Sequence, residues 1–141
     1  MGVKVVLKRT VTGAVSMEAA RTYWEGRGFD NWLPAGDVYT ATRGSSWANF
    51  ASFDSCKLSA QLKLVRVENG IEAEMEISTS MQLVTIWNYA KWQLELREFE
   101  IYLRTGQLDP ETWRDYRRNQ WRVYLDWRPA PALLRECLKR K

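Results

Sequence analysis

The sequence contains no histidine, only two cysteines, and no apolar run long enough to cross a membrane. The missing histidine removes the commonest acid–base catalyst and excludes Ser-His-Asp and Cys-His catalytic groups. Cys56 and Cys137 lie far apart and form no C-x-x-C pair. A disulfide scaffold and a Cys/His zinc site are therefore not expected, and both thiols should be reduced.

Motifs that identify common enzyme classes are missing as well. The chain has neither the G-x-G-x-x-G pattern of dinucleotide-binding proteins nor a phosphate-binding loop. These absences weigh against an enzyme without excluding one, and we expect no cofactor and no metal. The apolar residues at the N-terminus are too few for a signal peptide, so we expect a cytoplasmic protein.

The chain is long enough for one ordinary domain. It has 141 residues, of which 45% are hydrophobic and 27% charged, and these values are close to globular averages. Eight tryptophans are unusual for this length and indicate an aromatic-rich core. We predict a single α+β domain over residues 1–141, with residues 1–80 mostly sheet and residues 81–141 helical.

The first 80 residues alternate between strand patterns and one helix pattern. Alternation of apolar and polar residues predicts a strand near the N-terminus, over 3–12. Ser16 should cap a helix over 17–25 that ends at a glycine pair. Residues 29–37 are rich in turn formers and predict a loop, with Trp32 and Leu33 packed under it. Further strands are expected over 38–43, 47–53, 57–67 and 71–78.

Asn69-Gly70 separates the last two predicted strands. This pair between alternating runs is the strongest short hairpin signal, because both residues tolerate the positive φ angles of a type I′ turn. A two-residue loop at Asn69-Gly70 pairs Glu68 with Ile71 and places Lys63 opposite Glu76. The apolar residues of the two strands then share one face of the sheet.

Beyond residue 80 the spacing of apolar residues becomes that of a helix. An amphipathic helix is predicted over 87–103, with Lys91, Glu95 and Glu98 on its solvated side. Asp109 and Pro110 should begin a second helix that runs to about residue 127, and a short helix should cover 132–139. The element order β-α-β-β-β-β-α-α predicts an antiparallel sheet of about five strands, with helices on one face and a C-terminal helical extension.

Charge is concentrated in the last quarter of the chain. Residues 104–141 contain ten Lys/Arg and five Asp/Glu, which gives a net charge of +5, whereas the remaining residues carry a net charge of −1. Helical spacing groups several arginines and one tryptophan on a single surface: Arg114, Arg117, Arg118, Trp121 and Arg122. Trp and Arg are the residues most enriched at the hot spots of protein interfaces, so this set is the candidate partner- or anion-binding surface. The competing interpretation, which the spacing favours slightly, is an amphipathic helix with core aromatics on one side and solvated arginines on the other.

The leading hypothesis is therefore a non-enzymatic interaction module that binds another protein or a second copy of itself. Nucleic acid is a weaker candidate for the same arginine surface. An alternative follows from the element order, which is similar to that of the helix-grip lipid-binding domains. That resemblance implies a pocket for a small apolar ligand between the sheet and the long helix, lined by Trp87, Tyr89, Trp92 and Phe99.

A row of acidic residues, Glu72, Glu74 and Glu76, lies on one face of the last strand. Strict alternation in a half-exposed strand produces such rows, so we interpret it as a solvated sheet face rather than a metal site.

Overall fold

The computed structural model describes residues 4–44, 59–78 and 86–114, apart from the side chains of residues 86–90. These residues form a five-stranded antiparallel sheet and two helices, which confirms the predicted α+β class. The strands are β1 (Lys4–Thr12), β2 (Asp30–Ala35), β3 (Val38–Arg43), β4 (Ala60–Val67) and β5 (Gly70–Ser78). The helices are α1 (Met17–Gly26) and α3 (Ile86–Thr105).

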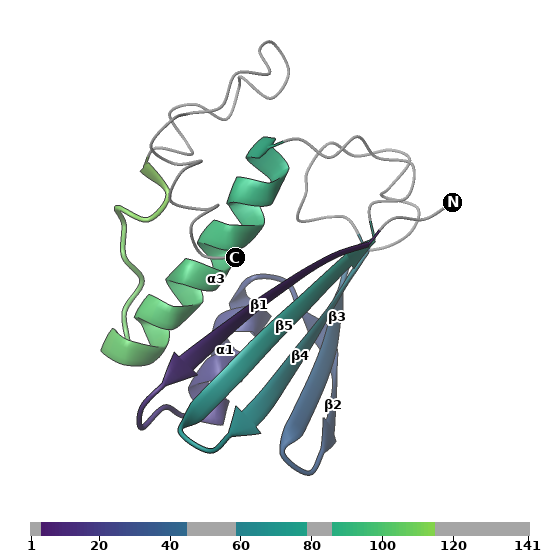
Figure 1. Ribbon diagram of the computed structural model, residues 1–141, viewed down its shortest axis with the longest axis vertical. Helices are drawn as coiled ribbons and strands as arrows, with labels where there is room; N and C mark the ends of the chain where they lie inside the picture. The colour runs from purple at the N-terminus through teal and green to yellow at the C-terminus, as the bar shows by residue number, and fades with distance from the viewer. Residues whose placement is uncertain (1–3, 45–58, 79–85, 115–141) are drawn as a thin grey trace.

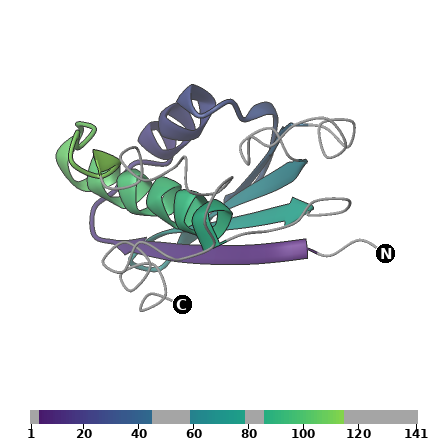
Figure 2. The same cartoon turned by 90° about the horizontal axis from the view of Figure 1, so that it is seen from above.

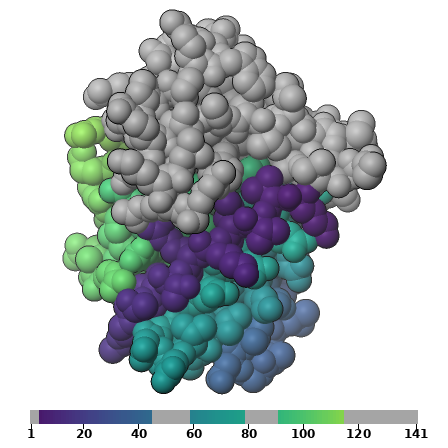
Figure 3. All heavy atoms as spheres, viewed as in Figure 1, coloured from purple at the N-terminus to yellow at the C-terminus, as the bar shows by residue number. Residues whose placement is uncertain are grey.

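The sheet has the order β1-β5-β4-β3-β2, so the first strand of the chain lies beside the last. Figure 1 shows the strands side by side, and Figure 2 shows both helices above the same face of the sheet. Neither described helix lies on the opposite face, where the described strands are at the surface in the space-filling view of Figure 3. Segments 47–53 and 115–141, including the predicted C-terminal helices, lie outside the described residues.

The core lies between the helices and the inner face of the sheet. Trp24 of α1 and Phe29 just after it meet Phe99 and Trp92 of α3, and all four side chains are almost completely buried. The Trp24 ring packs edge-on against Phe29 and is tilted against Phe99. The sheet contributes smaller apolar side chains from its inner face: Leu7, Val11, Ala41, Leu62, Leu64, Ile71, Ala73, Met75 and Ile77. The tryptophan excess therefore serves the core in part.

Local sequence signals explain where α1 begins and where the chain turns after α3. The Ser16 hydroxyl accepts a hydrogen bond from the backbone N–H of Ala19 at 3.2 Å, as a helix N-cap does. The Asp109 carboxylate accepts from the N–H of Glu111 at 3.0 Å, at the predicted start of the next helix. The Ser16 cap is confirmed. Residues 110–113 form turns, and most of the helix predicted to follow Asp109 lies outside the described residues.

The predicted loop over 29–37 is wrong, because residues 30–35 form the edge strand β2. This strand pairs with β3 irregularly, with a register shift between Asp30 and Leu33 and a positive φ of 56° at Asn31. Leu33 is not packed under a loop but is 67% exposed, whereas Trp32 does pack against the core. Turn-forming residues are tolerated here because an edge strand needs hydrogen bonds on one side only.

The β4–β5 hairpin forms as predicted, but its turn is displaced. Val67 pairs with Gly70, so the two loop residues are Glu68 and Asn69, and Lys63 faces Glu74 rather than Glu76. Neither Asn69 nor Gly70 has a positive φ. Each β4 residue therefore pairs with the β5 residue two positions before the predicted one, and an even shift leaves the apolar side chains on the inner face.

The acidic row of β5 lies on the face of the sheet opposite α1 and α3. Lys4 pairs with Glu76 at 2.8 Å, and Lys8 lies 3.5 Å from Glu74. Among the described residues, no three His, Cys, Asp or Glu side chains gather as a metal site would require. The interpretation of this row as a solvated face fits the pairing.

Candidate functional site

The structure describes only some of the residues that were predicted as site residues. Arg114 is exposed and pairs with Glu111, whereas Arg117, Arg118, Trp121 and Arg122 lie outside the described residues. Trp92 and Phe99 are fully buried core residues, and the side chains of Trp87 and Tyr89 lie outside the described part of α3. The structure instead brings together a group of buried charged residues that the sequence analysis did not single out as a site.

This group is a buried ionic cluster centred on Glu95 of α3. Glu95 is 0% exposed, although the sequence pattern predicted it on the solvated side of its helix. The Arg43 guanidinium, at the end of β3, binds it in a bidentate manner at 2.7 and 3.1 Å. Arg27, which follows α1, donates from Nε to the same carboxylate at 2.8 Å. The prediction was wrong because the partners of Glu95 come from two other elements.

The charge of Glu95 is maintained by these two arginines. Burial alone would raise the pKa of the Glu95 carboxyl, but the charges and hydrogen bonds of Arg43 and Arg27 outweigh it and lower the pKa. Arg43 also donates to the backbone carbonyl of Arg27 at 3.1 Å and lies 4.5 Å from the centre of the Phe29 ring. The cluster therefore joins β3, α3 and the end of α1 through one carboxylate.

Glu98, one turn further along α3, is the second acidic residue that was wrongly predicted to be solvated. It is 6% exposed instead of solvated. The Tyr23 hydroxyl lies 3.0 Å from its Oε1 and 2.8 Å from the carbonyl oxygen of Glu95, so one hydrogen serves two acceptors. Burial raises the pKa of Tyr23, and the nearby Glu98 and Glu95 charges add to the effect, so the phenol keeps its proton.

Trp113 connects the segment after α3 to this cluster. Its Nε1–H donates to Oε2 of Glu98 at 2.9 Å, and the Arg27 guanidinium lies 5.1 Å from the centre of its ring. An N–H bond to a carboxylate and a cation–π contact are each worth more in a partly buried place than in water. Trp113 thereby fixes the point from which the basic part of the chain continues.

A hollow of about 370 Å³ opens beside these residues, between α1, α3 and the segment that carries Trp113. Three aromatic rings, a carboxylate, a guanidinium and an exposed leucine line it: Tyr23, Tyr102, Trp113, Glu98, Arg27 and Leu108. Its volume lies within the range of about 300–1,000 Å³ that small-molecule sites occupy. It combines apolar walls with a few convergent polar groups, which is the usual composition of a binding site.

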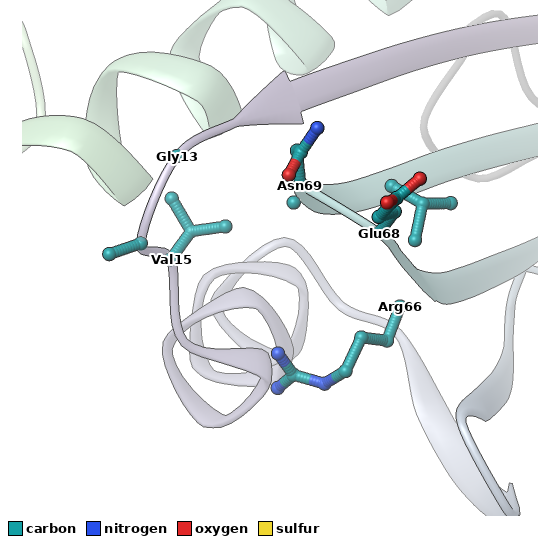
Figure 4. Close-up of a pocket in the computed structure, with 8 residues that line it drawn as sticks. Gly13, Val15, Arg66, Glu68 and Asn69 are labelled. Carbon is teal, nitrogen blue, oxygen red and sulfur yellow. The ribbon is translucent and has the colours of Figure 1, made fainter.

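A second hollow of about 490 Å³ lies where the β4–β5 turn approaches the segment between β1 and α1. Figure 4 shows Val15 on one side, Glu68 and Asn69 on the turn, and Arg66 extending toward α1. Arg66 is exposed, and its backbone N–H bonds to the Asp37 carbonyl. With mainly backbone and exposed side chains around it, this hollow offers no buried polar group to orient a ligand.

The structure gives no sign of a membrane-crossing segment in the part that it describes, since neither helix is long and apolar enough to span a bilayer. Comparison of the chain with protein-family models, with curated proteins and with solved structures found no match.

Proposed function

We propose that this chain is a non-enzymatic interaction module that binds an acidic protein through the basic segment beginning at Arg114. The observation that carries this proposal is the separation of charge, with +5 in residues 104–141 and −1 in the remainder. A folded body with little net charge thus carries a basic segment at one end. Complementary charge speeds encounter and selects among partners.

The anchoring of Trp113 supports the proposal. An interaction surface gains affinity when its position is fixed before binding, because less conformational entropy is lost. The contacts of Trp113 with Glu98 and Arg27 hold the chain immediately before Arg114. The Arg114–Glu111 pair is more than half exposed on both sides, so a partner carboxylate could replace Glu111 at little cost.

The proposed contact set is the one indicated by helical spacing: Arg114, Arg117, Arg118, Trp121 and Arg122. Arginine can bind a carboxylate through two parallel hydrogen bonds, and tryptophan supplies apolar area at low entropic cost. An acidic protein surface satisfies both residue types. Self-association and nucleic-acid binding are the competing outcomes of the experiment below.

The experiment compares two charge-reversed variants of the full chain. One carries Arg114→Glu and Arg118→Glu, and the matched control carries Arg21→Glu and Arg66→Glu, two exposed arginines of the body. Proteins captured by the wild type, after nuclease treatment, are purified and their affinity for all three chains is measured. We expect one acidic protein whose Kd rises at least tenfold with the first variant, rises with salt, and changes little with the control.

Three results would overturn the proposal. Capture that disappears with nuclease treatment would indicate nucleic acid, whose binding falls steeply with salt. A native mass at a multiple of 16.5 kDa without another protein would indicate self-association. Equal affinity for both charge-reversed variants would show that the C-terminal arginines do not form the surface.

A further inference from the structure

The hollow beside Trp113 has a chemistry that the proposed protein interaction does not require. Its walls are the rings of Tyr23, Tyr102 and Trp113, and the carboxylate of Glu98, a residue only 6% exposed, is an acidic group within it. Aromatic walls favour a flat apolar ligand, which can stack on or pack edge-on against them. A buried carboxylate favours a ligand that brings a hydrogen-bond donor, since an ionised carboxylate can only accept.

Glu98 has room to accept from a ligand. A carboxylate offers about four acceptor positions, and the described donors to Glu98 are the Tyr23 hydroxyl and the Trp113 ring nitrogen, one on each oxygen. Tyr23 keeps its proton, as its raised pKa indicates, and so remains a donor. The two neutral donors fix the carboxylate without cancelling its charge, so a third donor gains a charge-assisted hydrogen bond.

The contact of Trp113 shows what kind of group these residues recognise. Its indole is a planar ring whose N–H bonds to Glu98 at 2.9 Å while the ring lies 5.1 Å from the guanidinium of Arg27. Arg27 is held by Glu95, so its position does not depend on Trp113. The lining thus already binds one planar ring through an N–H bond and a cation–π contact, and space remains beside that ring.

We propose that this hollow is a binding site for a small, uncharged heteroaromatic molecule that carries a ring N–H. The ligand packs among Tyr23, Tyr102 and Trp113 and donates its N–H to Glu98. A cationic ligand is disfavoured by Arg27, and an anionic ligand by Glu98. This site is separate from the arginine surface, so either proposal can fail without the other.

The experiment uses indole and benzofuran, two probes of nearly the same shape of which only the first has an N–H. The full wild-type chain is titrated with each probe. Calorimetry and the side-chain Nε1–H resonance of Trp113 both monitor the titration and give the two affinities. We expect saturable indole binding with a shift of that resonance, and an affinity for benzofuran at least tenfold weaker. That ratio corresponds to the loss of a hydrogen bond to a charged group.

Three variants locate the site. Tyr102→Ala removes one half-buried wall and should weaken indole binding about tenfold. Leu33→Ala should leave the affinity for indole unchanged, because Leu33 lies on β2, at the opposite edge of the sheet from β1, the strand that α3 contacts. Trp113→Ala should bind indole more tightly than the wild type does, because the probe takes the vacated place, and indole should then raise the Tm of this variant. If Trp113→Ala does not fold, Tyr102→Ala still decides the question.

The proposal is overturned by equal affinity for the two probes, which would mean that no N–H is recognised. It is equally overturned by indole binding that Tyr102→Ala leaves unchanged, or by the absence of indole binding at millimolar concentration.

Discussion

At the scale of single residues, Glu95 is the most completely buried charged residue among those that the structure describes. An unpaired carboxylate inside a protein costs many kcal/mol, whereas this one accepts hydrogen bonds from two guanidinium groups. One of them, Arg43, is itself only 5% exposed. Each member of the group is therefore tolerable only because the others are present, and the removal of one leaves charges without compensation.

Glu95→Gln should lower the free energy of unfolding by about 3–5 kcal/mol, the usual cost of breaking a buried ion pair from one side. The matched control is Glu25→Gln, which removes the Arg21–Glu25 pair on the exposed surface of α1. That change should cost less than about 1 kcal/mol. Urea unfolding of the three chains at neutral pH measures both values, and similar losses in the two variants would contradict the burial argument.

Stability should also decline in acid. Burial opposes ionisation of Glu95 and Glu100, but neighbouring arginines lower the pKa of both below the ordinary 4.5. Below pH 4.5 the unfolded chain therefore binds more protons than the folded chain. The contribution of these groups is fully present above that pH and is lost as pH falls through their folded-state pKa values.

Urea unfolding between pH 3 and pH 7 tests this dependence. The slope of unfolding free energy against pH should be shallower in Glu95→Gln than in the wild type. Glu111→Gln, whose carboxylate is 62% exposed, should retain the wild-type slope. An unchanged slope in Glu95→Gln would mean that another group controls the acid transition.

At the scale of elements, Gly70 sets how closely the hairpin approaches β1. A Cβ at this position would lie 1.9 Å from the carbonyl oxygen of Val11, and the Asn69 carbonyl accepts from the N–H of Gly13 at 2.6 Å. The glycine is thus needed for close approach of two backbones rather than for a left-handed turn. The Asn-Gly signal identified the hairpin correctly but for a reason that does not apply here.

Gly70→Ala should destabilise the protein by at least about 2 kcal/mol, because the backbone of β1 must move away. Gly26, at the end of α1, is the control, since an added Cβ there meets nothing within 4 Å. Gly26→Ala should be neutral or stabilise by about 0.5–1 kcal/mol through helix propensity. Thermal and urea unfolding compare the two, and equal effects would exclude the steric explanation.

Most of the fold could be predicted because its elements carry strong local patterns. The alternation in β1, β4 and β5 and the helical spacing of α1 and α3 are confirmed. The edge strand β2 was missed because Asn31, Pro34 and Gly36 are turn formers, and its pairing with β3 is a tertiary feature. Periodicity within one element could not reveal it.

The candidate site was much less predictable. Glu95 and Glu98 looked solvated because acidic residues on a helix usually are, and their burial depends on Arg43, Arg27, and Tyr23. These residues lie far away in sequence, so no spacing rule connects them.

At the scale of the whole molecule, Trp113 connects the start of the basic segment to the body. Trp113→Phe keeps a ring next to Arg27 but removes the donor to Glu98. We expect a loss of about 1–3 kcal/mol, because a buried carboxylate oxygen loses a hydrogen bond. Hydrogen exchange should accelerate in residues 106–112 in parallel with the reduced stability.

Trp32→Phe is the matched control for this substitution. Trp32 also lies against an arginine, Arg21, but its ring nitrogen bonds to a neutral carbonyl at 3.3 Å and is only partly buried. The same chemical change should therefore cost less than about 1 kcal/mol. If both variants lose equal stability, the Glu98 bond contributes nothing specific.

The pairing of β1 with β5 has a consequence for how the protein is made. Leu7 pairs with Met75, which follows it by 68 positions. At a synthesis rate of about 5–20 residues per second, β1 leaves the ribosome roughly 3–14 s before its neighbour is complete. Until then the apolar side chains of β1 have no strand beside them, and a nascent chain interrupted before residue 70 would expose them to chaperones and to other unfinished chains.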